Sequence, residues 1–416
     1  MLRRLWPLTL RGTGAALLAL VCFIVANEVG IPELMYFGML LVAVLVAAVA
    51  SLYLTRHADS VTRSLAPDTV GVGRASLVRV RVGVRTALPT PPGTWTDTLP
   101  AGLEGTAAGV FPALGSGLKG SDRTVNLAYT VTGVRRGIHH LGPLRVHSAD
   151  PFALARRSTL YGQRTRVTVA PAVIDLPPLT GLAGEAGGTL QTQNNQPGQG
   201  ADNLIARPYA PGDSMRRIHW RATAHRDELM VRQEEQEATP EATVILDRGV
   251  LRWSTEALHE PGADDAFETA VSACVSVVSR LVRDGYGVSV LDSDGTALTE
   301  RIDGGDTAAV EDLVSQFATV TARRDDHLPR LARQFAGVMT GPVIVLTGRL
   351  DPADVDALAP IVHHSTFAVL LAASPRSGAL DRAGDIGWHA VHLDPDGDLV
   401  QEWAAAGERG VSRALR

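Results

Sequence analysis

The chain begins with two apolar stretches that a short polar turn separates. No residue from Leu34 to Leu54 is charged, and a helix of this length, at about 1.5 Å per residue, covers the roughly 30 Å hydrocarbon core of a bilayer. The uncharged stretch from Thr13 to Ala26 is shorter, so we expect its helix to extend back to Leu8, with Arg11 reaching the membrane interface. The pattern predicts a membrane anchor with two transmembrane helices over residues 1–58.

Basic residues lie at the outer ends of this hairpin and acidic residues lie in its turn. Residues 27–33 contain two acids and no base, whereas three arginines precede the hairpin and Arg56 and Arg63 follow it. By the positive-inside rule, both termini and the soluble domains face the cytoplasm from the plasma membrane. Two alternatives stay open: a signal peptide cleaved near Ala26, and a single span with a surface-lying first helix, which reverses the orientation.

Apolar and polar residues alternate along much of the next hundred residues. Residues 78–84 place a valine at every second position, with arginine or glycine between, which is typical of a β-strand with one buried face. Residues 125–131 follow the same period, and turns rich in glycine and proline separate further short strands. The pattern predicts a small β-sandwich over residues 66–176.

The period changes after a segment rich in glycine and glutamine. Residues 181–200 contain almost no large apolar side chain, which predicts a flexible linker over residues 177–203. Beyond residue 238 short apolar strands alternate with amphipathic helices. We expect strands at 243–246, 288–291, 342–346, 367–371 and 389–393, and helices at 265–283, 307–320, 352–358 and 400–406. The fold class is therefore α+β multidomain, ending in a doubly wound α/β domain over residues 238–416.

Composition excludes several classes of protein. The formal net charge is −5, which argues against a nucleic-acid-binding protein, because such domains are usually strongly basic. The only two cysteines are Cys22 and Cys274, which excludes a disulfide-stapled scaffold and a zinc or iron–sulfur site with several cysteine ligands. Both cysteines lie in apolar stretches, where we expect them to pack as small hydrophobic residues.

Residues 204–237 contain the most concentrated set of charged, histidine and aromatic residues that could bind a partner or ligand. A Pro-Gly turn is followed by a predicted helix from Met215 to Ala224, and Leu229–Gln233 predicts a returning strand. The helix is strongly cationic within an acidic protein. Three interpretations remain open: Ile218 and Trp220 packed at a domain junction, a protein-docking surface anchored by tryptophan and arginine, and a surface for anionic lipid or nucleic acid.

This segment resembles the signature of the bacterial domain-of-unknown-function 58 family. The matching pattern is Tyr209-x-Pro211-Gly212-Asp213-x-x-Arg216-Arg217-Ile218-His219-Trp220-Arg221-x-Thr223-Ala224, and Arg135-Arg136-Gly137 and Asp150-Pro151-Phe152 match upstream. The resemblance covers nearly the whole chain. It implies a membrane hairpin, a β-domain, the signature and a von Willebrand factor A-like domain, with a MoxR-type AAA+ ATPase as partner. The candidate interaction residues are Tyr209, Pro211, Gly212, Asp213, Arg216, Arg217, His219, Trp220, Arg221 and Arg226.

The resemblance also supplies a test for a metal site. Metal-binding von Willebrand A domains carry Asp-x-Ser-x-Ser after their first strand, because Mg²⁺ prefers hard oxygen ligands. Asp247 matches the first position as a residual metal-site residue, but Gly249 and Leu251 replace both serines. Thr347 stands where a later aspartate is expected. We therefore expect neither a stable metal site nor a cofactor, and we expect Asp247 to cap a helix or pair with an arginine.

The motifs of catalysis do not form a recognisable set in the sequence. His219 and His225 are six residues apart, which suits neither spacing of a metal-binding pair on one helix face. We expect no enzymatic activity. The leading hypothesis is a membrane-anchored adaptor or scaffold that presents the A-like domain to a MoxR-type ATPase, with the lipid bilayer and envelope proteins as other partners and no nucleic acid. The alternatives are a structural component of a cell-envelope assembly complex and an undetected hydrolase.

Overall fold

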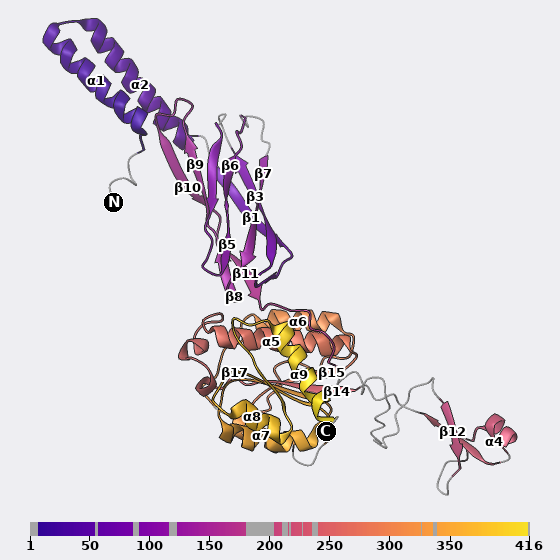
Figure 1. Ribbon diagram of the computed structural model, residues 1–416. Helices are drawn as coiled ribbons and strands as arrows, with labels where there is room; N and C mark the ends of the chain where they lie inside the picture. Colours follow the sequence, from indigo (N-terminus) through magenta and orange to yellow (C-terminus); the bar gives the residue numbers. More distant parts are fainter. Residues whose placement is uncertain are drawn as a thin grey trace. The chain divides into compact units, whose positions relative to one another are not determined.

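The computed structural model contains both helices and several sheets, so the chain is a mixed α+β protein (Figure 1). It describes residues 7–54, 57–85, 91–115, 123–179, 204–209, 215, 218–226, 228–234, 240–325, 327–335 and 339–414. Two compact units divide the chain. Unit 1 comprises residues 1–174, 248–275 and 311–325, and unit 2 comprises residues 175–247, 276–310 and 326–416.

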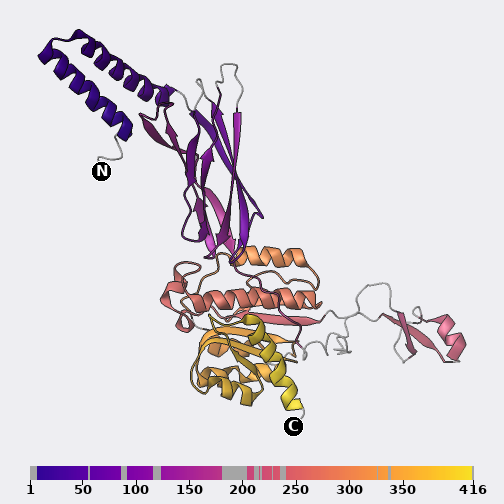
Figure 2. The same ribbon diagram turned by 45° about the horizontal axis from the view of Figure 1, so that its top comes forward.

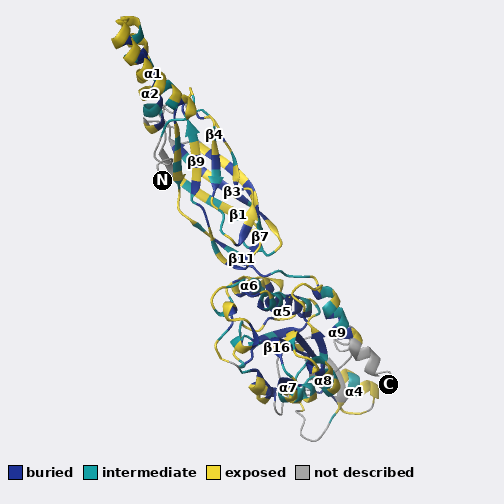
Figure 3. Ribbon diagram, turned by 60° about the vertical axis from the view of Figure 1, so that its left-hand side comes forward, coloured by how far each residue is buried: buried dark blue, intermediate teal, exposed yellow. Residues whose placement is uncertain are grey.

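Two long apolar helices open unit 1. They are α1 (Leu10–Val29) and α2 (Pro32–Leu54). The Thr9 hydroxyl caps α1, and Gly30 ends it in the left-handed conformation, with φ at 70°, which glycine adopts without steric cost. In the most apolar part of each helix, only 22% of the residues of α1 and 17% of those of α2 are buried. Figure 3 shows most of both helices as exposed. Both helices are therefore long and apolar enough to cross a membrane.

After the two helices, the described residues from His57 to Ala170 form antiparallel and mixed sheets of strands. One sheet has the order β1–β3–β7–β5, formed by His57–Ala66, Ala75–Arg85, Arg123–Gly133 and Leu103–Gly105. A second has the order β10–β9–β4–β6, formed by Arg156–Tyr161, Leu144–Ala149, Gly93–Asp97 and Ala108–Phe111. Both are antiparallel. A third small sheet, β2–β11–β8, joins Val70–Gly71, Thr165–Ala170 and Gly137–Leu141.

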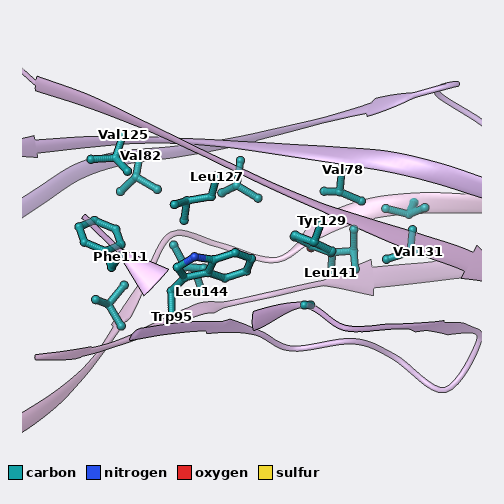
Figure 4. Close-up of a cluster of buried hydrophobic side chains, with 14 of the residues drawn as sticks. Val78, Val82, Trp95, Phe111, Val125, Leu127, Tyr129, Val131, Leu141 and Leu144 are labelled. Carbon is teal, nitrogen blue, oxygen red and sulfur yellow. The ribbon is translucent and has the colours of Figure 1, made fainter. Parts of the chain in front are cut away.

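One hydrophobic cluster lies between the two four-stranded sheets. The four alternating valines of β3 are buried, as their spacing predicted, and Figure 4 shows side chains from both sheets directed toward one another. Trp95 of β4 and Tyr129 of β7 lie 5.7 Å apart between ring centroids. The expected period of two and the sandwich arrangement are therefore present.

A buried ion pair joins the two sheets. Arg63 of β1 donates from Nε and Nη2 to the two carboxylate oxygens of Asp97 at 2.9 and 3.0 Å, and both side chains are fully buried. The Tyr129 hydroxyl donates to Asp97 Oδ2 at 2.8 Å. Burial, reinforced by the Asp97 charge, raises the pKa of Tyr129 above its ordinary value, so this hydroxyl stays protonated and keeps its role as a donor.

Strand β1 begins at His57, earlier than the sandwich was expected to begin. Val61 and Leu65 pack against the sandwich core, but Arg63 lies between them on the alternating positions. An arginine in the middle of a buried face breaks the apolar period, because its burial depends on a partner from a distant strand. The alternation therefore does not reveal β1.

A second buried arginine, from the Arg-Arg-Gly motif, contacts the helical part of unit 1. Arg136 donates from Nε and Nη2 to Glu268 of α5 (Asp265–Arg283), both at 2.6 Å. It also donates to the carbonyl oxygen of Phe317, the last residue of α6 (Thr307–Phe317). The guanidinium lies 5.9 Å from the centroid of the Phe267 ring. The motif thus supplies a buried cation with a carboxylate, a carbonyl and an aromatic ring around it.

Unit 2 is built on a five-stranded parallel sheet. The strands are β14 (Glu241–Leu246), β15 (Gly287–Asp292), β16 (Val343–Leu350), β17 (Ala368–Pro375) and β18 (His389–His392). All neighbouring strands run parallel, in the order β15–β14–β16–β17–β18. Numbered along the chain, this is the 2-1-3-4-5 order of doubly wound sheets, with a switch point between β14 and β16. The predicted parallel α/β topology is present.

Helices on one face of this sheet enclose a second core. The elements η5 (Leu328–Phe335), α7 (Pro352–His364) and α8 (Ala379–Ile386) contribute buried side chains that cluster with those of β14, β16 and β17. Figures 1 and 2 both show α7 and α8 on the same side of the sheet. The C-terminal α9 (Leu399–Ala414) is joined to the edge strand β18, because Nδ1 of His389 lies 2.8 Å from the carbonyl oxygen of Ala406.

The first residues of the predicted linker lie against α9. The Trp403 indole donates to the carbonyl oxygen of Pro177 at 2.9 Å, and Leu179 is buried. Arg283 of α5 donates to Asp175 Oδ1 at 2.5 Å. Hydrogen bonds and the burial of Leu179 therefore hold residues 175–179 against the rest of unit 2, and residues 180–203 of the predicted linker lie outside the described residues.

Candidate functional site

The family signature forms a small element of its own, which we call the signature module (residues 204–234). Strand β12 (Leu204–Pro208) pairs antiparallel with β13 (Met230–Glu234). The predicted returning strand is therefore present, shifted by one residue. Ile218 forms a β-bridge with Val231, and both residues are buried together with Met230. These three side chains supply the apolar contacts that the short hairpin needs.

The signature helix begins later than its sequence predicted. Helix α4 spans Trp220–Arg226, whereas we expected a helix from Met215. The backbone N–H of His219 donates to the carbonyl oxygen of Met230 at 2.8 Å, and this bond together with the bridge at Ile218 holds the chain in an extended conformation there. Because the pairing with β13 uses these groups, they are not free for helical hydrogen bonds.

His219 has a structural role at the start of α4. Its Nδ1 accepts a hydrogen bond from the backbone N–H of Ala222 at 3.0 Å, which satisfies one of the free donors at a helix N-terminus. The Thr223 hydroxyl accepts from the backbone N–H of Met230 at 3.0 Å. The His and Thr of the signature thus fix α4 against β13.

Trp220 is exposed, whereas one of the three interpretations of this segment had it packed at a domain junction. Its exposed fraction is 69%, whereas Ile218 of the same pattern is buried. Arg221, His225 and Arg226 of α4 are also exposed. Arg221 and His225 are four residues apart and so lie on one side of the helix. One short helix thus exposes a large aromatic side chain and two arginines, residue types that are enriched in protein interfaces.

The other signature residues divide into one described and five undescribed positions. Tyr209 is half-buried, and its backbone N–H donates to the carbonyl oxygen of Leu229 at 2.7 Å, which extends the hairpin by one bond. The candidate residues that lie outside the described residues are Pro211, Gly212, Asp213, Arg216 and Arg217.

A second candidate site lies at the carboxyl end of the parallel sheet, where doubly wound folds bind ligands. Asp247 follows β14 and is fully buried, and its Oδ2 accepts a hydrogen bond from the Thr347 hydroxyl of β16 at 2.8 Å. Thr347, which stands where the resemblance implies an aspartate, is thus a hydrogen-bond partner of the residual acid. Asp292 and Ser293 are also buried at the end of β15.

Magnesium is expected to cause no saturable change in the intrinsic fluorescence of the full-length chain. Among the described residues, no group of three or more His, Cys, Asp or Glu side chains is placed to hold a metal ion. The positions that would supply hydroxyl ligands hold Gly249 and Leu251, and the Thr347 hydroxyl donates to Asp247, whereas Mg²⁺ requires near-octahedral oxygen ligands. A saturable response that disappears in Asp247→Asn would contradict this prediction.

Comparison with known proteins points to the same segment. Residues 205–335 match the model of the family described as "Protein of unknown function DUF58". The chain is 23% identical over 264 residues to the uncharacterized protein YeaD of Bacillus subtilis (strain 168), a match that covers 61% of each chain.

Solved structures give a weaker likeness. The crystal structure of the CARDB domain of the PF1109 protein from Pyrococcus furiosus, described as a complex with di-metal ions, is 16% identical, with a TM-score of 0.18. The match covers 26% of this chain and 87% of that one. The solution structure of the same domain gives 16% identity and a TM-score of 0.17, over 26% of this chain and 93% of that one. Likenesses of this size carry no conclusion about fold or function.

The match over the signature module and the start of the α/β region confirms the family that the sequence motif indicated. Residues 205–335 therefore carry the segment of the DUF58 family, a family of unknown function.

Proposed function

We propose that this chain is a membrane-anchored adaptor without catalytic activity of its own, and that it presents a von Willebrand factor A-like domain to a MoxR-type AAA+ ATPase. The soluble units face the cytoplasm in this proposal, as the charge distribution around the hairpin favours. The ATPase partner follows from the family resemblance. The observation that carries the adaptor role is the exposed Trp220 on the signature module.

The anchor is supported by the contrast between the helices and the rest of the chain. Side chains such as Leu40 and Val46 of α2 are exposed, although they are large and apolar. A soluble protein rarely leaves so continuous an apolar surface in water, because its transfer out of water is favourable by roughly 25 cal/mol per Å². A lipid bilayer covers this surface in the proposal.

The A-like assignment of the second half is supported by topology and by one residue. Unit 2 has a central parallel sheet with a switch point beside its first strand, and Asp247 stands directly after that strand. Its carboxylate is buried and hydrogen-bonded to Thr347, which favours a structural role over ligand exchange. The buried, hydrogen-bonded Asp247 is therefore consistent with a domain that binds a protein partner without using a metal ion.

The docking role of the signature module is supported by its surface. Because Trp220 is 69% exposed, its side chain contributes little to the stability of the module. The helix that carries Trp220 is nevertheless fixed, because His219 caps its start and Thr223 accepts a hydrogen bond from Met230 of β13. Tryptophan and arginine are the side chains most enriched among residues that dominate binding energy at interfaces. A partner with an apolar pocket beside acidic groups is complementary to this surface.

Replacing Trp220 with alanine is expected to weaken capture of a MoxR-type ATPase by the full-length protein in nanodiscs. An interface anchor of this type contributes about 2 kcal/mol or more, which corresponds to about 30-fold in Kd. The measurement is ATPase retention at graded concentrations in the presence of ATP. Val110→Ala is the matched control, because Val110 is also a large exposed apolar residue, at 71%, and lies in strand β6 of the sandwich, outside the module and the A-like domain.

Equal retention by Trp220→Ala and the unchanged protein would remove the docking role of the module. If no MoxR-type ATPase is retained by any variant, the adaptor function itself is wrong. Crosslinking that recovers only membrane proteins would then favour the structural component of an envelope assembly complex.

A further inference from the structure

The loop between β9 and β10, which we call the Asp150 loop (residues 150–155), is built around one buried carboxylate. Asp150 Oδ2 accepts a hydrogen bond from the backbone N–H of Phe152 at 2.9 Å, and Oδ1 accepts from that of Ala155 at 2.5 Å. The Asp150 carbonyl also accepts from the N–H of Ala153 at 3.0 Å. These bonds hold the loop in one conformation, in which Ala153 takes the left-handed region with φ at 57°.

Backbone hydrogen bonds join this loop to the beginning of α1. The N–H of Thr9 donates to the carbonyl oxygen of Leu154 at 2.8 Å, and the Thr9 hydroxyl donates to that of Ala153 at 2.6 Å. The N–H of Arg156 donates to the carbonyl oxygen of Pro7 at 2.7 Å. The approach is so close that a Cβ on Gly12 would lie 2.0 Å from the Leu154 oxygen, so only glycine fits there.

The same region also contacts the last two turns of α2. Ala155 packs in a buried apolar cluster with Ala48 and Leu52. Arg157, just after the loop, donates from Nη1 to the carbonyl oxygen of Leu52 at 3.1 Å. Its guanidinium lies 4.4 Å from the centroid of the Tyr53 ring. The loop and the residues beside it are therefore attached to the beginning of α1 and to the end of α2.

The Phe152 side chain is 67% exposed, although hydrogen bonds to Asp150 fix the backbone of its loop. Tyr53 of α2, whose ring contacts Arg157, is 56% exposed, and Arg11 of α1 is exposed as well. Aromatic and arginine side chains are the residues that gather at the boundary between the headgroups and the hydrocarbon of a bilayer. If α1 and α2 span a membrane, their ends mark this boundary, and the loop lies there with them.

We propose that the Asp150 loop is a membrane-contact surface that places the Phe152 ring among the lipid headgroups and the adjoining acyl chains. The inference rests on the membrane anchoring proposed above and adds a third contact point to the two helices. Its occupant is the bilayer that the hairpin itself spans. The Asp-Pro-Phe motif has two parts in this account: the aspartate folds the loop and the phenylalanine enters the interface.

A fluorescent probe at position 152 tests the proposal in the full-length protein. Cys22→Ala and Cys274→Ala remove the native thiols, and Phe152→Cys carries an environment-sensitive nitrobenzoxadiazole dye in vesicles that contain brominated lipids. We expect quenching several-fold stronger than at Val134→Cys. Val134 is also an exposed apolar residue of unit 1, at 46%, but follows the end of β7. That end pairs with the start of β3, away from the strand end that follows α2.

A third probe separates this inference from the proposed anchoring. Leu40→Cys places the dye within α2 on an exposed side. Strong quenching at position 40 with equal, weak quenching at positions 152 and 134 would overturn the membrane contact of the loop and leave the anchor intact. Weak quenching at all three positions would overturn both. Strong quenching at positions 40 and 152 alone supports both.

Discussion

Replacing Arg136 with alanine is expected to lower the free energy of unfolding of unit 1 by about 3–5 kcal/mol, the usual cost of removing one partner of a buried ion pair. The Arg136 side chain is fully buried and that of Glu268 is 22% exposed. The substitution leaves the Glu268 carboxylate without its bidentate donor and the Phe317 carbonyl without its hydrogen bond. Denaturant titration of the full-length protein in nanodiscs, followed by tryptophan fluorescence, measures the loss.

The neighbouring arginine provides the matched control for this prediction. Arg135 approaches Glu260 only to 3.9 Å, and the side chains are 44% and 75% exposed. Exposed pairs of this kind contribute about 0–1 kcal/mol, so Arg135→Ala is expected to leave the unfolding midpoint nearly unchanged. If both substitutions lower the free energy of unfolding by the same amount, the buried ion pair of Arg136 contributes no more to stability than the exposed pair of Arg135.

Asp97→Ala is expected to destabilise the β-sandwich by a similar amount, about 3–5 kcal/mol. The change leaves the fully buried guanidinium of Arg63 without its carboxylate and the Tyr129 hydroxyl without its acceptor. Arg63 retains bonds to Gln163 and Thr165, which do not neutralise its charge. The shift of the unfolding midpoint of the full-length protein measures the effect.

Two further variants of this cluster make the prediction specific. Tyr129→Phe removes one hydrogen bond and is expected to cost about 1 kcal/mol. Arg79→Ala, at an exposed position of β3, is expected to change stability by less than about 0.5 kcal/mol. Asp97→Ala with an effect no larger than that of Arg79→Ala would mean that the inter-sheet ion pair makes no net contribution.

The sequence was sufficient for features whose signal is local and periodic. Uninterrupted apolar runs predicted α1 and α2, the period of two predicted β3 and β7, and alternating strands and helices predicted the parallel sheet. Each of these signals lies within the element itself, as an uninterrupted run of apolar residues or as apolar residues repeated along one face.

Features that depend on distant partners could not be predicted in this way. Arg63 conceals β1 because its partner Asp97 lies 34 residues away, and Arg136 finds Glu268 across 132 residues. In the signature module, pairing of Ile218 with Val231 displaces the start of α4. The exposure of Trp220 was equally hidden, because a tryptophan beside an apolar residue carries no sign of which side chain packs inward.

The attachment of Thr9 to the Asp150 loop sets an order of assembly during synthesis. Thr9 and its acceptor Leu154 are 145 residues apart, so the ribosome completes the hairpin long before the loop exists. Non-local contacts form late, because the intervening chain must first be brought together. In the membrane-anchored form proposed above, the hairpin is already in the bilayer before the sandwich has formed. The first part of unit 1 to be synthesised therefore receives its final contacts only after strands β1 to β9 have been added.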